Sequence, residues 1–166
     1  GVRMEERVAI LMPDCPEMVY AFFGTMKMGA VAIPMNTLLV PKDYEYLLND
    51  SRAQVLLVHP MLLDRIQPIR SQLAYLKHMI VAMDSEGDWL ALDPLMAEAS
   101  PELEAADTSK DDAAFWLYSS GTTGFPKGTI HLHHDMIVEA DLYARDVLGI
   151  TEDDICFSVA KLFFAY

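Results

Sequence analysis

A run of glycine, serine and threonine residues with one lysine, at positions 118–128, has the residue types that hold a phosphate group. It reads Tyr-Ser-Ser-Gly-Thr-Thr-Gly-Phe-Pro-Lys-Gly. Glycines let the backbone approach an anion closely and direct several N–H groups at it. Hydroxyl groups add donors, and a lysine adds a mobile positive charge. The residues that we expect to bind and neutralise phosphate oxygens are Ser119, Ser120, Gly121, Thr122, Thr123, Gly124 and Lys127.

The residues on either side of this run predict that it joins two strands. Apolar segments at 113–118 and 129–132 enclose it, whereas a flexible linker, the alternative interpretation of such a run, needs no such neighbours. In the common nucleoside-triphosphatase loop, the lysine is followed by Ser or Thr and a helix begins there. Here Gly128 follows Lys127, and the alternating sequence after it favours a strand. Any magnesium ion must therefore be held differently.

The chain before this run alternates short apolar segments with amphipathic ones, which is typical of α/β proteins with parallel strands. The predicted strands cover residues 8–12, 30–34, 54–59, 78–83 and, further on, 155–159, and the predicted helices cover 14–29, 41–49, 62–76 and 135–147. We expect Asp14 to cap the first helix, Gly29 to end it, and Pro68 to bend or break the third. The fold class is therefore α/β, with parallel strand-helix repeats followed by a strand, the phosphate loop and a second strand.

Residues 84–112 differ in character, because they hold ten acidic side chains and a single basic one, Lys110. A solvated connector explains such a run better than a cation site does. We therefore divide the chain into a strand-helix lobe at 1–83, this acidic connector, and a segment at 113–166 that holds the phosphate loop.

Composition argues against several function classes. Twelve basic and 25 acidic residues give a formal net charge of −13, which disfavours a nucleic-acid or anionic-membrane surface. Only two cysteines occur, so neither a disulfide framework nor a cysteine-based metal site is expected. No apolar run reaches the roughly 18 residues that span a bilayer, and residues 1–7 lack the pattern of a secretory signal. We expect a cytoplasmic protein without membrane insertion.

The run at 118–128 resembles the phosphate loop of the adenylate-forming superfamily, which includes acyl-CoA synthetases and luciferases, at nearly every position. The longer stretch at 115–136 looks most like the benzoate-CoA ligase branch, and residues 7–39 are similar to the early strand-helix-strand region of the superfamily. The resemblance implies that a carboxylic acid and ATP form an acyl-adenylate and pyrophosphate, after which coenzyme A displaces AMP. The implied cofactors and partners are ATP, Mg²⁺, coenzyme A and an aromatic acid such as benzoate.

The resemblance also implies roles for individual residues. Lys127 and Thr122 become the expected catalytic residues, because the reaction depends on positioning ATP and neutralising charge. A threonine hydroxyl is expected in the Mg²⁺ shell, completed by an acid elsewhere. Phe164, Ala165 and Tyr166 correspond to one wall of the acyl pocket, and packing in the core is the alternative for these three.

Three histidines, His131, His133 and His134, invite a metal interpretation, because residues two apart on a strand share a face. A nearby cysteine or a clear third ligand is missing from the sequence around them. We therefore expect structural roles for the histidines and no metal site built by them.

The later motifs of the superfamily, including its Tyr-Gly-x-Thr-Glu segment and the small domain with a catalytic lysine, do not occur in these residues. The resemblance therefore predicts one incomplete AMP-binding domain, a piece of a larger ligase that is inactive alone. Apolar surface left bare in such a piece predicts self-association. Two alternatives stay open, namely a phosphate-binding module without chemistry and a fatty-acyl-CoA ligase.

Overall fold

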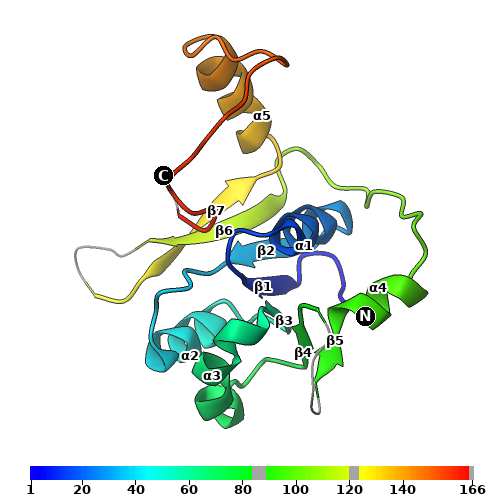
Figure 1. Ribbon diagram of the computed structural model, residues 1–166, viewed down its shortest axis with the longest axis vertical. Coiled ribbons are helices and arrows are strands. Elements are labelled where there is room, and N and C mark those ends of the chain that lie inside the picture. Colours follow the sequence, from blue (N-terminus) through cyan, green and yellow to red (C-terminus); the bar gives the residue numbers. More distant parts are fainter. Residues whose placement is uncertain (84–88, 120–123, 165–166) are drawn as a thin grey trace.

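The computed structural model describes residues 1–83, 89–119 and 124–164. Among them, seven strands form one sheet in the order β5-β4-β3-β1-β2-β6-β7 (Figure 1). The strands are β1 Arg7–Leu11, β2 Val31–Pro34, β3 Val55–Val58, β4 His78–Val81, β5 Leu90–Ala91, β6 Ala113–Ser119 and β7 Lys127–Leu132. All neighbouring strands are parallel except β6 and β7, which are antiparallel. The predicted α/β fold, with a mostly parallel sheet, is confirmed.

Helices cover both faces of this sheet (Figure 1). They are α1 Pro16–Lys27, α2 Pro41–Asp50, η1 Pro60–Leu62, α3 Leu63–Ile66, η2 Gln67–Gln72, α4 Leu92–Glu98, α5 Asp135–Glu139 and the π-helical η3 Ala140–Arg145. Because successive strand residues point to opposite faces, Ala9 and Leu11 of β1 pack with α2 and α3 in one apolar cluster. Val8 and Ile10 pack with α1 in the other. The central strands are thus buried on both faces, which explains their continuous apolar sequences.

The predicted cap of α1 was wrong. Cys15 is the N-cap residue and makes no side-chain cap hydrogen bond. The Asp14 carboxylate instead accepts a hydrogen bond from the Leu162 N–H at 3.1 Å and lies 3.8 Å from the Lys161 ammonium. The Asp14 carboxylate is therefore bound by residues far along the chain and does not cap α1, although its local spacing had predicted a cap.

Glycine and proline mark helix ends as expected, although one helix is shorter than predicted. Gly29 has a φ of +77° directly after the C-cap of α1. The expected third helix is confined to the single turn of α3, and the 3₁₀ helix η2 continues through Pro68. Proline has no N–H and its ring crowds the preceding turn, so the α-helical pattern stops before it.

Within residues 89–112, the part of the acidic segment that the structure describes, the regular elements are β5 and α4. β5 adds an edge strand to β4. The chain then runs mostly exposed toward β6 and contacts α1 through a hydrogen bond from the Ala106 N–H to the Lys27 carbonyl, at 2.8 Å. The division of the chain into a lobe, a connector and a loop segment stays a prediction.

The C-terminal part forms an arm in which the strand predicted at 155–159 is absent. Figure 1 shows α5 at one end of the molecule, away from α2 and α3. Ile155, Phe157 and Val159 are 98%, 89% and 86% exposed, and no described strand pairs with them. Their alternating pattern has the right period, but a strand also needs a neighbour to bond its backbone groups.

A search of the described helices for one long and apolar enough to span a lipid bilayer finds none.

Candidate functional site

The turn between β6 and β7 lies at the carboxyl end of the parallel strands. Ser119, the last residue of β6, pairs with Lys127, the first residue of β7, and Tyr118 pairs with Gly128. The strand-loop-strand arrangement is therefore as predicted, with β7 beginning two residues earlier than expected. Because β6 runs parallel to β2, the residues that follow β2 approach the same edge. Ligand sites of open α/β sheets form at this edge.

A cavity of about 360 Å³ opens beside the turn. Its lining includes Asn36 after β2, Leu47 of α2, Tyr118 and Ser119 of β6, and Phe163 and Phe164 of the C-terminal arm. Phe163 is 5% exposed and packs with the α1 cluster, which anchors the arm at this point. The structure thus brings Ser119, from the expected phosphate loop, and Phe164, from the expected acyl pocket, to one cavity.

The described residues cover only part of the predicted site. Ser120, Gly121, Thr122, Thr123, Ala165 and Tyr166 lie outside them. Lys127 is exposed and forms no ion pair with any residue that the structure describes, so its ammonium is available to an anion. The described members of the predicted site are Ser119, Gly124, Lys127 and Phe164.

Two glycines of the loop motif occupy restricted positions, Gly124 through its backbone angle and Gly128 through neighbouring side chains. Gly124 has a φ of +110°, which side chains disfavour. A Cβ atom at Gly128 would lie 3.3 Å from Cζ of Tyr118, closer than most contacts of a Cβ atom, and 3.4 Å from Cε3 of Trp116. The Tyr118 ring therefore lies against the Gly128 backbone, and the turn starts from a closely packed pair of strands.

Replacing Gly124 with alanine is expected to destabilise the protein by about 1–3 kcal/mol, the usual cost of a side chain in such a backbone region. Urea unfolding measures the change. Gly24→Ala is the matched control, because Gly24 lies inside α1 with no atom within 4 Å of an added Cβ. That control is expected to stabilise the protein by about 0.5–1 kcal/mol. Equal stabilities of the Gly124→Ala variant and the unaltered protein would contradict the glycine requirement.

Contacts from α2 to both ends of the turn were not anticipated from the sequence. The Tyr118 hydroxyl donates a hydrogen bond to Asp50 Oδ2 at 2.6 Å, and the Tyr46 hydroxyl donates to the Pro126 carbonyl at 3.0 Å. Burial, together with the Asp50 carboxylate, raises the pKa of Tyr118, which keeps its hydroxyl protonated as a donor. No local spacing links α2 to the loop motif, so sequence reasoning had no signal for these contacts.

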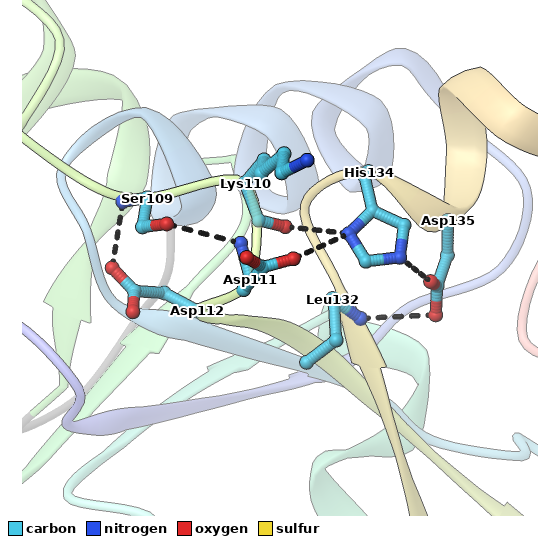
Figure 2. A network of polar contacts seen from close by, with 7 residues as sticks. All are labelled: Ser109, Lys110, Asp111, Asp112, Leu132, His134 and Asp135. Carbon is cyan, nitrogen blue, oxygen red and sulfur yellow. Dashed lines mark hydrogen bonds and ion pairs between the residues drawn. The ribbon is translucent and has the colours of Figure 1, made fainter.

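A network of polar contacts fixes the turn between β7 and α5 (Figure 2). The Asp135 carboxylate accepts a hydrogen bond from the Leu132 N–H at 3.0 Å and lies 3.2 Å from His134 Nε2. The other ring nitrogen of His134 lies 3.2 Å from the Asp111 carboxylate and 3.0 Å from the Lys110 carbonyl. His134 therefore joins the residues that precede β6 to the start of α5.

His131 and His133, the other two histidines of this segment, also have protein partners or packed positions. His131 stacks on Phe115 with ring centroids 4.6 Å apart, and its Nδ1 lies 3.3 Å from Asp135 Oδ2. His133 Nε2 is buried without a hydrogen-bond partner among the described residues. The same residues contain no group of three or more His, Cys, Asp or Glu side chains able to hold a metal ion.

Comparison with known proteins identifies the family. A family model described as AMP-binding enzyme matches residues 1–166. The chain belongs to the AMP-binding enzyme family. This AMP-binding chain is 48% identical to the benzoate-CoA ligase of Thauera aromatica, over 100% of its own length and 31% of that protein's length. The predicted resemblance to benzoate-CoA ligases is thereby confirmed.

Solved structures of CoA ligases share the fold of this AMP-binding chain. An anthranilate CoA ligase in complex with anthranoyl-AMP superposes with a TM-score of 0.96 at 44% identity, over 99% of this chain and 32% of that one. A benzoate CoA ligase from Burkholderia xenovorans superposes with a TM-score of 0.87 at 40% identity, over 100% of this chain and 32% of that one. The AMP-binding chain thus spans 31% to 32% of the length of these relatives.

Proposed function

We propose that this AMP-binding chain forms the phosphate-holding part, and one wall of the acyl pocket, of an ATP-dependent CoA ligase for an aromatic carboxylic acid. The observation that carries the proposal is the 48% identity to a benzoate-CoA ligase over the whole chain. The cavity that Ser119 and Phe164 share supports it, because such a reaction needs a phosphate site next to an acyl site. Since the relatives are about three times longer, the activity is proposed for a protein of their length.

The described residues fit an ATP phosphate group. Lys127 presents an exposed ammonium that has no ion-pair partner among the described residues, and Gly124 has a positive φ that glycine adopts without strain. We assign Lys127 and Thr122 to neutralising the charge that develops as the carboxylate attacks the α-phosphorus. Ser119, Ser120, Gly121, Thr123 and Gly124 are assigned to holding the phosphates through hydroxyl and backbone donors.

Magnesium and coenzyme A complete the proposed reaction. Mg²⁺ usually binds nucleotide phosphates together with one or two protein oxygens and water, and we assign a threonine hydroxyl of the loop to that shell. The ion adds positive charge on the phosphate oxygens when bound. Coenzyme A then accepts the acyl group and releases AMP. We place the ligase in the cytoplasm, where ATP and coenzyme A are available.

The preference for an aromatic acid follows from relatives and from the cavity lining. The proteins named above are ligases of benzoate or anthranilate. Phe163 and Phe164 bring aromatic rings to the cavity, with centroids 4.7 Å apart. A flat ring stacks favourably against such side chains, and Phe164, Ala165 and Tyr166 are the proposed wall for it.

Carboxylate-dependent exchange of labelled pyrophosphate into ATP tests the proposal, because it reports adenylation alone. The assay compares benzoate with a medium-chain fatty acid, using a protein of the relatives' length. Exchange with benzoate is the expected result. Exchange with the fatty acid alone would establish a fatty-acyl-CoA ligase. No exchange with any acid would contradict the ligase and leave a phosphate-binding module without chemistry.

The C-terminal arm, which contains α5 and η3, leads us to propose that the 166-residue chain self-associates when it is studied alone. Ile137, Leu142 and Val147 of this arm are 64%, 62% and 67% exposed. Exposed apolar side chains of this kind favour association in water. Sedimentation velocity is expected to show species larger than a monomer, which Leu142→Glu reduces and Leu38→Glu, outside α5 and η3 and 75% exposed, does not. A clean monomer that binds no hydrophobic dye would contradict this expectation.

A further inference from the structure

Two side chains one helical turn apart on α2, Tyr46 and Asp50, contact both ends of the β6–β7 turn. Asp50 Oδ2 accepts the hydrogen bond from the Tyr118 hydroxyl at 2.6 Å, at the β6 end. Tyr46 donates to the Pro126 carbonyl at 3.0 Å, at the β7 end. The Tyr46 ring also stacks on Phe125, with centroids 4.8 Å apart and an angle of 24° between the rings. Residues four apart share one helix face, so α2 meets the turn with a single face.

The helix that carries these side chains is itself firmly held. Tyr44, Leu47 and Leu48 on its inner side are buried against the sheet. The Tyr44 hydroxyl donates to the Asn36 carbonyl at 2.8 Å, which ties α2 to the residues after β2. Asn49 donates to the Gln72 carbonyl at 2.9 Å. Because α2 is held in place, Tyr46 and Asp50 on its outer face can restrict the position of the residues that they contact.

The two contacts differ in strength and kind. The 2.6 Å hydrogen bond from Tyr118 to Asp50 has a carboxylate acceptor, and charge-assisted bonds of this length are stronger than neutral ones. The Tyr118 ring packs against Gly128, where an added Cβ atom would lie 3.3 Å from Cζ of Tyr118. At the other end, Tyr46 combines a neutral hydrogen bond with ring stacking, so it restricts both the backbone of Pro126 and the ring of Phe125.

We propose that Tyr46 and Asp50 are positioning residues for the phosphate site, holding Ser119 and Lys127 in place through the two ends of the turn. The inference rests on the proposed function. Tyr118 and Pro126, the residues bonded to α2, each directly precede a predicted phosphate ligand, Ser119 and Lys127 respectively. Groups that must meet ATP within a fraction of an ångström need such support, because a shift of 1 Å can cost about a hundredfold in rate.

Steady-state pyrophosphate exchange with benzoate, in a protein of the relatives' length, tests this role. Tyr46→Ala and Asp50→Ala are expected to raise the KM for ATP roughly tenfold, a part of the loss that misplacement can cause. The KM for benzoate is expected to stay nearly unchanged, which a general loss of structure would not allow. Tyr46→Phe keeps the ring stacking and Asp50→Asn keeps an acceptor oxygen, so both are expected to give intermediate values. Glu45→Gln, on the same helix, is the control for a lost negative charge.

Hydrogen exchange in the 166-residue chain provides a second measurement that needs no activity. The amides of residues 124, 125, 127 and 128 are expected to exchange faster in Tyr46→Ala and Asp50→Ala, with no change for Glu45→Gln and none in α1. If the unaltered enzyme shows no pyrophosphate exchange, the proposed function fails. The amide exchange still decides whether Tyr46 and Asp50 hold the two ends of the turn. ATP KM values equal to that of the unaltered enzyme, or unchanged amide exchange, would overturn the positioning role.

Discussion

Replacing Lys127 with alanine, in a ligase of the relatives' length, is expected to lower the rate of adenylation by about a hundredfold or more while the fold is kept. Loss of one preorganised group that stabilises developing charge costs on the order of 10² to 10³ in rate. Lys127 is exposed at the first position of β7 and has no ion-pair partner among the described residues, so its removal leaves no buried charge behind. Pyrophosphate exchange with saturating benzoate measures the rate, and thermal unfolding checks the fold.

Two variants make this result specific to Lys127. Lys77→Ala removes an exposed positive charge just before β4, at the opposite end of the parallel strands, and is expected to leave exchange unaltered. Lys127→Arg keeps the charge but changes the shape of the donor, so partial activity is expected. Full exchange by Lys127→Ala would remove this lysine from the site. A large fall in melting temperature would instead make its role structural.

The central strands could be predicted from the sequence alone, because burial on both faces requires apolar residues at successive positions. β1 and β3 lie between other parallel strands and have apolar residues on both faces, so they read as continuous apolar runs. Gly29, Pro68 and the Gly-rich turn gave equally local signals, because each reflects a restriction on its own backbone dihedral angles or its own N–H.

Features that depend on distant partners were mispredicted or missed. Asp14 has the spacing of a helix cap, yet its carboxylate binds residues 161 and 162. Residues 155–159 alternate like a strand but have no described strand beside them. Asp50 and Tyr118 are hydrogen-bonded although they lie 68 positions apart in the sequence, and no periodicity in either segment indicates this contact. The loop motif predicted which residues would hold phosphate, whereas the side chains that orient the motif emerged only from the fold.

The stability of the frame under the site is expected to depend most on the middle of β3. Leu56→Ala is expected to lower the free energy of unfolding by about 2–5 kcal/mol, because it removes buried methyl groups and leaves a cavity. Leu56 is 0% exposed, pairs with Ala9 of β1 and Met79 of β4, and belongs to the cluster beneath α2. The backbone neighbours on both sides limit how far the site can collapse, which favours the upper part of that range.

Urea unfolding of the 166-residue chain measures this loss, with Leu38→Ala as the matched control. Leu38 is 75% exposed in the turn after β2, so the same substitution there is expected to change stability by less than about 0.5 kcal/mol. Equal effects of the two substitutions would mean that β3 is not packed on the α2 side of the sheet. In that case α2 would not be held against the sheet, and Tyr46 and Asp50 on α2 could not fix the position of the β6–β7 turn.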